Sequence, residues 1–228
     1  MHKGDLKKQA ILETAEKLFF EKGYSSATID DILAELGCSK GSLYHHFDSK
    51  QQILRDLCVR EADSAFKSYS ESAFPDTLAA FNSLLYHGVL LRSGQERLLS
   101  TLLPLSGTND GDLMVAAQIR AQETLFLPEV RRLLDLLKAE KQAFWNLPML
   151  PDLVWHTYTS LYGDMISFAG ELMKGSSQPG KIISILEAAR FIFERTLDLP
   201  YGSIEIIRAD EALNTVNLAL KHNRYLNP

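Results

Sequence analysis

The sequence predicts an all-α protein in which a three-helix, helix-turn-helix domain precedes a larger helical domain. Three observations predict this fold class. Apolar residues recur at helical spacing along most of the chain, glycines, prolines and N-capping residues separate these stretches, and no alternating run of β-branched residues is long enough for a sheet. With 46% hydrophobic and 23% charged residues, the 228-residue chain can bury a substantial core. We place the domain boundary so that residues 1–50 form the first domain and residues 51–228 the second.

The same composition limits where the protein can be located and which disulfide or metal sites it can contain. The longest apolar runs, such as 84–91 and 182–189, are shorter than the roughly 18 residues that a membrane span needs. The N-terminal residues contain no signal-peptide core, so we expect a cytoplasmic protein that does not enter a membrane. Cys38 and Cys58 are too few for a disulfide framework and have no metal-ligand spacing. They are interpreted as partly buried thiols or as a redox switch, and we expect neither a metal nor a cofactor.

The first expected helix covers residues 6–22, where apolar residues form a stripe and charged residues lie opposite. Gly23 can end this helix, because glycine adopts the left-handed conformation without a Cβ penalty. Tyr24 is then placed to contact Phe19 and complete the helix end. The stripe consists of Leu6, Ala10, Ile11, Ala15, Leu18 and Phe19.

A second, short helix is expected to begin after Thr28, with Asp31 three residues later completing an N-terminal cap. Gly37 ends it after about two turns. Its buried stripe follows the spacing i, i+3, i+4, i+7 and consists of Ile29, Ile32, Leu33 and Leu36.

Ser39 can cap a third helix, in which Leu43 and Phe47 share one face. Ser49 with Gln52 forms a capping-box pattern for a fourth helix that continues toward Tyr69.

Glycines, prolines and polar stretches divide the remaining chain into helices of roughly 15 to 25 residues. The last two long ones are expected at 180–198 and 203–222. Breaks are expected near Pro75, Gly94, Ser106–Asp112, Pro128, Pro148–Pro151, Gly175–Gly180 and Pro200–Gly202.

The second and third helices, joined at residues 37–39, form a helix-turn-helix, the motif whose second helix enters the DNA major groove. Leu43 and Phe47 anchor the inner face of this helix. The outer face is left with Lys40, Gly41, Ser42, Tyr44 and His45.

The charge distribution permits this interpretation. Residues 1–55 hold eight Lys and Arg against eight Asp and Glu, so the net charge of −5 lies outside this segment. A neutral domain can bind DNA if its cations gather on one face. Gly41 is costly inside a helix, by roughly 1 kcal/mol relative to alanine, so it either allows close approach to DNA or is tolerated near a helix start.

The motifs of this region resemble the TetR family of regulators. The resemblance is carried by Ala10-Ile11-Leu12, Leu18-Phe19 and Gly23-Tyr24, by Thr28-Ile29 with Ile32-Leu33, and by the run from Gly37 to Lys50. It spans about residues 7–57, roughly a quarter of the chain. It implies an N-terminal DNA-binding domain joined to a helical domain for ligand binding and dimerisation.

The resemblance also implies roles for individual residues. Lys40 and Gly41 match positions that touch base edges, and Ser42 adds a base or backbone contact. Thr28, Tyr44, His45 and Lys50 match positions that hold phosphates. From the residues themselves, Tyr44 can instead pack as a half-buried ring, Lys50 can be a solvated charge, and His46 is either an intramolecular partner or a DNA contact. The full DNA-binding set is Thr28, Ser39, Lys40, Gly41, Ser42, Tyr44, His45 and Lys50.

For the second domain the resemblance implies that the last two long helices pair with those of a second copy. Residues 180–198 are apolar around much of the helix, as an interface helix or a buried core helix would be. The expected interface residues are Ile185, Ala189, Ile192, Phe193, Leu213 and Val216.

A ligand pocket is implied among the middle helices of that domain. Aromatic residues with polar tips suit an apolar cavity with a few orienting hydrogen bonds, although an aromatic stripe also suits plain core. No Arg or Lys interrupts the stripe, so the expected effector is neutral and apolar or aromatic. The expected pocket residues are Met114, Phe144, Trp145, Trp155, Tyr158, Tyr162 and Met165.

Taken together, these patterns predict a DNA-binding transcription regulator. The most specific expectation is a repressor that binds a pseudo-palindromic operator as a homodimer and leaves it when a small molecule binds. The alternatives are a helix-turn-helix protein that acts through protein partners, or an activator. An enzyme is not expected, because the sequence has no phosphate loop, nucleophile elbow or metal-spaced His/Glu pair.

Overall fold

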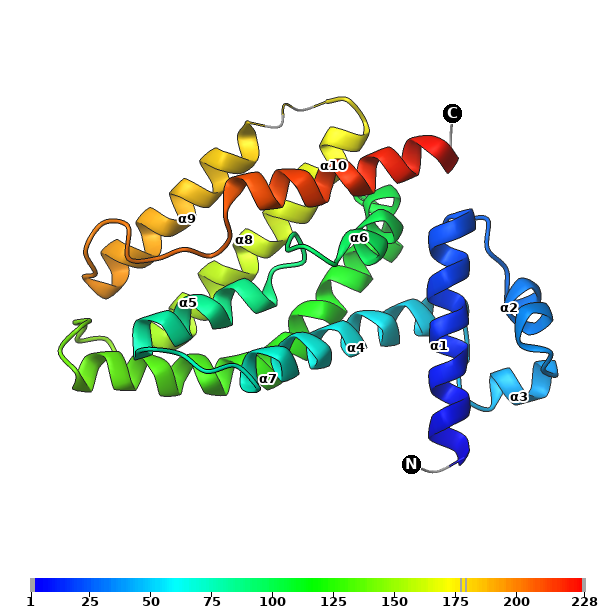
Figure 1. The fold of residues 1–228 in the computed structure, drawn as a ribbon, viewed down its shortest axis with the longest axis horizontal. Coiled ribbons are helices and arrows are strands. Elements are labelled where there is room, and N and C mark those ends of the chain that lie inside the picture. Colours follow the sequence, from blue (N-terminus) through cyan, green and yellow to red (C-terminus); the bar gives the residue numbers. More distant parts are fainter. Residues whose placement is uncertain (1–2, 177, 179, 227–228) are drawn as a thin grey trace.

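The computed structural model describes every residue except 1–2, 177, 179 and 227–228, and its described part consists of helices and their connections, as predicted. Three helices form a small head, α1 (Lys3–Lys22), α2 (Ile29–Leu36) and α3 (Lys40–Tyr44). Figure 1 shows α1 standing between the body and the pair α2 and α3, with α4 leading from the head into the body. No helix in the described part is long and apolar enough to cross a membrane.

Local capping interactions define the head helices. The Thr28 hydroxyl accepts a hydrogen bond from the Asp31 amide, and the Asp31 carboxylate accepts one from the Thr28 amide, so the predicted capping box is present. Gly37 ends α2 in the left-handed conformation, with φ of 58°. Ser39 caps α3 through a bond from the Ser42 amide. The boundaries predicted around residues 28–39 are therefore confirmed.

The end of α1 also matches its prediction. Gly23 has φ of 81°, and the rings of Phe19 and Tyr24 meet edge to face with centroids 5.1 Å apart. Together with Ile32 and Leu43, these two rings are buried in the core of the head. The helix itself begins three residues earlier than predicted, at Lys3.

In the described part of the chain, seven helices and one 3₁₀ turn make up the body. The longest, α7, packs mainly against α4, α5 and α8, while α9 packs on α8 and α10 lies across α6. Figure 1 shows α4, α5 and α7 along one side of the body and α8, α9 and α10 along the other. The helices are α4 (Lys50–Ser70), α5 (Thr77–Gly88), α6 (Glu96–Leu102), η1 (Leu103–Leu105), α7 (Asn109–Ala139), α8 (Leu150–Met173), α9 (Lys181–Leu197) and α10 (Ala209–Leu226).

The break predicted at Pro128 is wrong, because α7 continues through this residue. A proline inside a helix leaves the carbonyl of the residue four positions earlier, here Thr124, without its usual donor. Thr124 and Pro128 are both exposed, so water can satisfy that carbonyl. Phe126 and Val130, on the opposite face, are buried and hold the two halves of the helix in one line.

The helix predicted at 203–222 begins six residues late, at Ala209. The preceding segment is held outside a helix by side chains from other elements. Asn82 donates to the Ser203 carbonyl and accepts from the Glu205 amide, and Glu194 accepts from the Ile204 amide. Asn82 is more than 120 residues away and Glu194 belongs to the preceding helix, so the periodicity of the segment itself did not reveal these contacts.

Besides the chain connection through α4, the head contacts the body through side chains of α1. On α1, the Phe20 ring stacks on the His222 imidazole of α10 with centroids 3.7 Å apart, and the Phe20 carbonyl lies 2.6 Å from His222 Nε2. The Arg97 guanidinium of α6 lies 5.3 Å from the centre of the same ring. On the α4 side, Arg60 and Glu16 form an ion pair of 2.5 Å. Helix α1 is therefore docked to three body helices.

Candidate nucleic-acid interface

The outer face of α3 presents the side chains that the sequence placed there. Lys40, Gly41 and His45 are exposed, and Tyr44 keeps 42% of its surface accessible. Leu43, on the inner face, is completely buried and fixes the rotation of this short helix against the head core. A helix of five residues has little stability of its own, so this anchor and the Ser39 cap are what hold it in place.

Gly41 has open space beside it on α3, because a Cβ placed on it would meet nothing within 4 Å. Packing inside the protein thus does not require glycine at this position. The Lys40 ammonium lies 5.9 Å from the centre of the Tyr44 ring, on the same exposed face. A bare backbone beside a cation and an aromatic hydroxyl is an arrangement that can approach base edges and phosphates closely.

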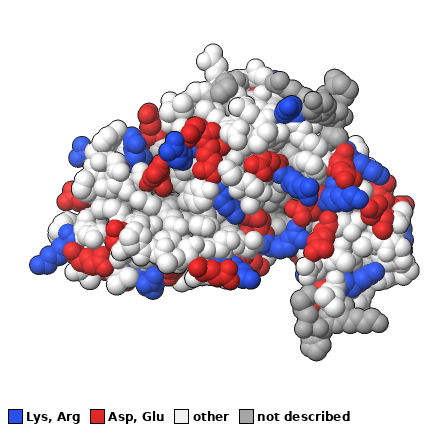
Figure 2. Space-filling view, in the orientation of Figure 1, with Lys and Arg blue, Asp and Glu red and all other residues white. Residues whose placement is uncertain are grey.

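Several other lysines of the head are neutralised by carboxylates. Lys8 pairs with Asp56 and Lys17 with Glu35, at 2.8 and 2.6 Å. Lys40 makes no ion pair with any described residue, so its charge is available to a polyanion. Figure 2 shows positive and negative side chains interspersed over the visible face, in line with the balanced charge of the head.

Lys50 differs from the other predicted phosphate contacts. It is half-buried, and its ammonium donates to the carbonyls of Tyr24 and Ala27 at 2.8 and 3.0 Å. Burial lowers the pKa of this amine below its ordinary value, and nearby Asp110 offsets only part of this effect. Two of the three N–H donors are therefore committed to the turn between α1 and α2, and one remains for a phosphate.

Thr28, also predicted at the phosphate backbone, is exposed while its hydroxyl takes part in the α2 cap. The Lys22 ammonium and the Thr28 groups hold the pKa of the Asp31 carboxyl well below its usual range. Of the remaining predicted contacts, Ser39 is exposed and Ser42 half-buried. His46 is half-buried and edge-on to His45, with ring centroids 5.1 Å apart.

The body contains a groove of about 790 Å³ between α4 and α7, directly beside the head. Small apolar side chains of α7 form much of its lining, and residues on both sides of the junction between head and body contribute. This volume falls in the range of small-molecule sites. Among the lining residues are Ser49, Arg55, Val59, Met114, Ala117 and Leu125.

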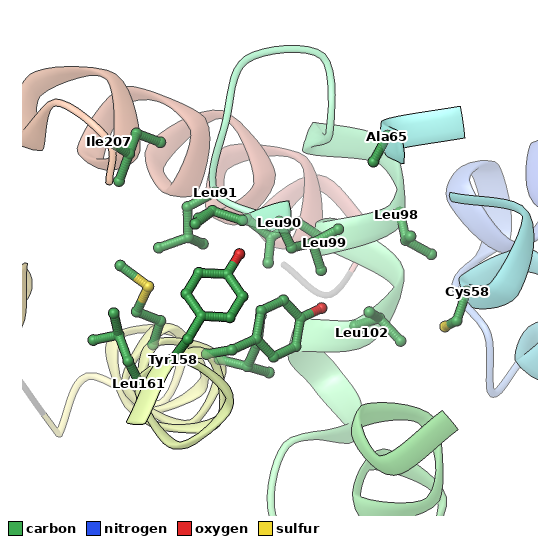
Figure 3. Close-up of a cluster of buried hydrophobic side chains, with 14 of the residues drawn as sticks. Cys58, Ala65, Leu90, Leu91, Leu98, Leu99, Leu102, Tyr158, Leu161 and Ile207 are labelled. Carbon is green, nitrogen blue, oxygen red and sulfur yellow. The ribbon is translucent and has the colours of Figure 1, made fainter. Parts of the chain in front are cut away.

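The structure separates the residues predicted to line one pocket. Met114 lines this groove, whereas Phe144, with 56% of its surface exposed, and half-buried Trp145 lie in the loop after α7. The stripe on α8 is core, and Figure 3 shows Tyr158 among leucines of the segment between α5 and α6 and of α6 itself. The buried members of the predicted set are Trp155, Tyr158, Tyr162 and Met165.

Polar groups nevertheless lie inside this core. The Tyr158 hydroxyl donates to the Leu85 carbonyl at 2.9 Å, and Glu61 pairs with Arg92, both largely buried. Burial raises the pKa of the Tyr158 and Tyr162 phenols well above its usual range. An ion pair is thus buried close to the tyrosines, although each charge is balanced by its partner.

Sequence reasoning missed two glutamines in this interior. Gln118 and Gln122 of α7 keep only 3% and 1% of their surface accessible. The sequence contains a pattern that could have identified them, because the two glutamines are four residues apart within the apolar stripe that runs from Met114 to Phe126. Polar residues inside such a stripe require partners or a function.

The predicted dimer residues divide into two groups. Phe193 and Val216 are buried in the core of their own chain, so their expected place at an interface is corrected; each fills space between helices of one subunit. Ile192 is exposed, and half-buried Ile185 and buried Ala189 line a shallow groove between α8 and α9. Half-buried Leu213 lies on α10.

Comparison with known proteins begins with the head. Residues 11–57 match the family model described as bacterial regulatory proteins, tetR family. The HTH-type transcriptional regulator EthR of Mycolicibacterium smegmatis is 33% identical over 109 residues, which is 43% of this chain and 50% of that protein. The negative transcriptional regulator IcaR of the biofilm operon icaADBC in Staphylococcus epidermidis is 46% identical over 48 residues, 21% of this chain and 26% of that protein. The matched stretches thus span half or less of these relatives.

The solved structures extend the likeness beyond the head. Salmonella enterica GusR superposes with a TM-score of 0.57 and 15% identity, covering 87% of this chain and 98% of that one. A tetR-family transcriptional regulator from Pectobacterium atrosepticum superposes with a TM-score of 0.54 and 17% identity, covering 88% of this chain and all of that one. At these identities the likeness concerns the fold.

Proposed function

Through residues 11–57 this chain belongs to the tetR family of bacterial regulatory proteins, and from that premise we propose that it is a cytoplasmic, ligand-responsive repressor that binds operator DNA as a homodimer. In this proposal residues 1–50 bind DNA and residues 51–228 bind the effector and the second copy. The observation that carries the DNA-binding role is the outer face of α3, where an unpaired Lys40 and an exposed Tyr44 flank the open backbone at Gly41. Repression is supported by IcaR, which is a negative regulator.

DNA binding is tested with duplexes from the promoter region of the protein's own gene, by fluorescence anisotropy at several salt concentrations. The double variant Lys40→Ala, Tyr44→Ala should bind the specific duplex at least tenfold more weakly, because it loses a base contact and a phosphate contact. Lys138→Ala, which removes a cation beside Trp145 far from the head, is the matched control and should bind normally. Unchanged affinity of the double variant would overturn the assignment of α3.

Salt dependence separates a DNA-binding role from a role in protein contacts. Neutralised phosphates release counterions, so the affinity should fall steeply as salt rises. Because Lys8 and Lys17 are already paired with carboxylates, we expect fewer phosphate contacts than the number of head lysines suggests. Affinity that does not change with salt or with DNA sequence would favour the alternative of a protein partner, and activation in a purified transcription assay would replace repression.

We place the homodimer interface on the α8–α9 face, which replaces α10 of the predicted pair by α8. Exposed Ile192 stands beside the shallow groove in which Ala188 and Ser160 lie, and small residues let helices from two subunits approach closely. Two heads joined in this way could reach half-sites one DNA turn apart, about 34–36 Å. Ile192→Asp should shift the protein toward a monomer in sedimentation experiments, whereas Leu218→Asp, at an exposed leucine of α10, should not. A dimer that survives Ile192→Asp would move the interface elsewhere.

Effector control would act through α4, the helix that leaves the head at Lys50 and forms one wall of the groove. Near the head, Gln51 of α4 donates to Asp110 of α7 at 2.6 Å, so the two helices are fastened at this end. A ligand that favours a different separation of α4 and α7 must lower the affinity of the protein for DNA. By reciprocity, bound DNA lowers the affinity for the ligand by the same factor. Release of the operator duplex by a bound compound, followed by anisotropy, tests this step.

A further inference from the structure

The C-terminal helix α10 contacts the head, although it is the last helix of the chain. His222 of α10 stacks on the Phe20 ring of α1, with centroids 3.7 Å apart and an angle of 6° between the planes. His222 Nε2 lies 2.6 Å from the Phe20 carbonyl, and because a carbonyl only accepts, this nitrogen is the donor. Phe20 is in the last turn of α1, where carbonyls lack helical donors, so the hydrogen bond can satisfy one of them.

The Phe20 ring is directed at the body and not at the head core. Its neighbour Phe19 is buried in that core against Tyr24. The half-buried Phe20 ring instead contacts His222 and the Arg97 guanidinium of α6, which lies 5.3 Å from the ring centre. Successive residues point about 100° apart around a helix, so adjacent aromatics can serve two sides of α1. Phe20 is thus a contact between head and body.

The end of α10 that contacts the head is itself fixed to the body. Asn223, next to His222, is buried and donates to the Ser100 carbonyl of α6 at 3.0 Å. Ser100 lies one turn from Arg97, so the same stretch of α6 holds the end of α10 and touches Phe20. Helix α10 also packs against α9, which forms part of the proposed dimer face. Through α10 the dimer face is therefore connected to the head.

The contacts along α4 leave one rotation of the head open. Gln51 at the start of α4 is fastened to Asp110 of α7, and the ion pair of Glu16 with Arg60 holds α1 on α4. Contacts that lie along a single helix do not prevent rotation about the axis of that helix. The ring contact with α10 and the packing of α1 on α6 lie away from α4 and therefore oppose this rotation.

The direction of α1 controls the position of α3. The first turn of α1 lies beside the residues that follow α3, since a Cβ on Gly4 would be 3.9 Å from His46 Cε1. Figure 1 shows α3 near the N-terminal half of α1 and the last turns of α10 near its other end. From Gly4 to Phe20 the helix spans about 24 Å, so a change of about 10° in its direction moves one end relative to the other by about 4 Å. This shift is roughly one base-pair step of 3.4 Å along DNA.

We infer that α10 is a brace for the head, in which His222 holds the direction of α1 and thereby limits the spacing of the DNA half-sites that a dimer can bind. His222 is a positioning residue, because it acts on α3 through Phe20 and contacts α1 at the end away from α3. This inference rests on the proposed function and adds a residue that restricts which operators fit.

The first measurement tests the brace without DNA. Spin labels are attached to Cys38 in the head and to Gln142→Cys at an exposed position of the body, while buried Cys58 stays unlabelled. Labelled chains are mixed with an excess of unlabelled copies, and pulsed EPR gives the distribution of head–body distances. His222→Ala should broaden this distribution about twofold. His222→Phe keeps a stacking ring and should broaden it less, and Lys221→Ala, at an exposed neighbour, should leave it unchanged.

The second measurement compares operators with the native half-site spacing and with one base pair added or removed, by fluorescence anisotropy. The parent protein should prefer the native spacing at least tenfold, because avidity is lost where two heads cannot engage together. His222→Ala should bind the native operator severalfold more weakly, since a loose head must be ordered on binding. Its preference for the native spacing should fall to about threefold or less. A residue that only stabilises the fold would weaken binding to all three operators equally.

Phe20→Leu removes the same contact from the side of the head and guards against a folding defect in one variant. It should reproduce both effects of His222→Ala, and the double variant should add little, because the two residues act through one contact.

The outcomes separate this inference from the proposed function. An unchanged distance distribution in both His222→Ala and Phe20→Leu would overturn the brace. A broader distribution with an unchanged spacing preference would overturn its role in the choice of operator. If the parent protein binds no operator with paired half-sites, the proposed function fails, and the distance measurement alone decides whether α10 braces the head.

Discussion

Gly88 is the position at which substitution by alanine tests the packing of the body interior most directly. A Cβ at this residue would overlap the Tyr158 hydroxyl, and it would lie 3.2 Å from Tyr158 Cζ and 3.5 Å from Phe126 Cε1. The Tyr158 ring is completely buried and cannot swing into solvent. Gly88→Ala must therefore displace this ring and break its 2.9 Å bond to the Leu85 carbonyl.

The expected cost follows from these contacts. Overpacking a close-packed core costs about 1–3 kcal/mol, and the lost hydroxyl bond adds about 1 kcal/mol. Alanine is the better helix former by about 0.5–1 kcal/mol, which offsets part of this at the last residue of α5. We therefore expect Gly88→Ala to lower the free energy of unfolding by about 2–3 kcal/mol, measured by urea denaturation at one protein concentration.

Tyr158→Phe supplies the matched background, because it removes the overlapping oxygen and leaves the ring. In that background Gly88→Ala should cost less than about 1 kcal/mol, since only the 3.2 Å ring contact remains tight. The difference between the two backgrounds measures the clash itself. Equal costs in both backgrounds, or no cost in the parent protein, would refute the reasoning that Gly88 and Tyr158 are in mutual contact.

Three further predictions concern titratable groups. Burial raises the pKa of the Cys58 thiol to about 12, so a thiol reagent at pH 8 should label Cys38 in the native protein and both cysteines only after denaturation; two rapid equivalents would contradict this. The pKa of Asp31 is lower in the folded protein than its unfolded value near 4, so the ionised carboxylate stabilises the fold above about pH 4 and this stabilisation is lost as the pH falls. Asp31→Asn should therefore flatten the acid side of a plot of unfolding free energy against pH; an unchanged acid side would count against the cap. Glu61→Ala should cost about 3 kcal/mol because it leaves a buried guanidinium unpaired, whereas Glu71→Ala, in an exposed pair, should cost under about 1 kcal/mol; equal costs in chemical denaturation would refute the distinction.

The head could be predicted closely because its boundaries depend on neighbours in the sequence. The Thr28 cap, the Gly37 end and the Ser39 cap each involve residues within three or four positions of one another. The aromatic contact between Phe19 and Tyr24 is equally local. Caps and helix ends of this kind are specified by short patterns, so the sequence alone places α3 and its exposed face.

The body was predicted less well because its details depend on distant partners. The backbone of residues 203–205 is held outside a helix by hydrogen bonds with Asn82 and Glu194. Lys50 has the sequence position of a phosphate contact, yet its ammonium binds the carbonyls of Tyr24 and Ala27, more than twenty residues earlier. Contacts of this length leave no periodic trace.

The position of the ligand pocket stays a prediction for a different reason. Large aromatic residues with polar tips, such as Tyr158 and Trp155, are as suitable for core as for a pocket, and the pattern could not separate the two uses. Gln118 and Gln122 are buried amides inside an apolar stripe of α7, which is uncommon and could have been noticed in the sequence.

The stack of His222 on Phe20 has a consequence for the order of events during synthesis. The head emerges from the ribosome first, and its own core can form from residues that are close in the sequence. Its attachment to α10, however, joins residues about two hundred positions apart and must wait until that last helix has been made. Until α10 has been made, a folded head is thus held by α4 and α6 at most, and the final orientation of the exposed α3 face relative to the body is set only when α10 has docked.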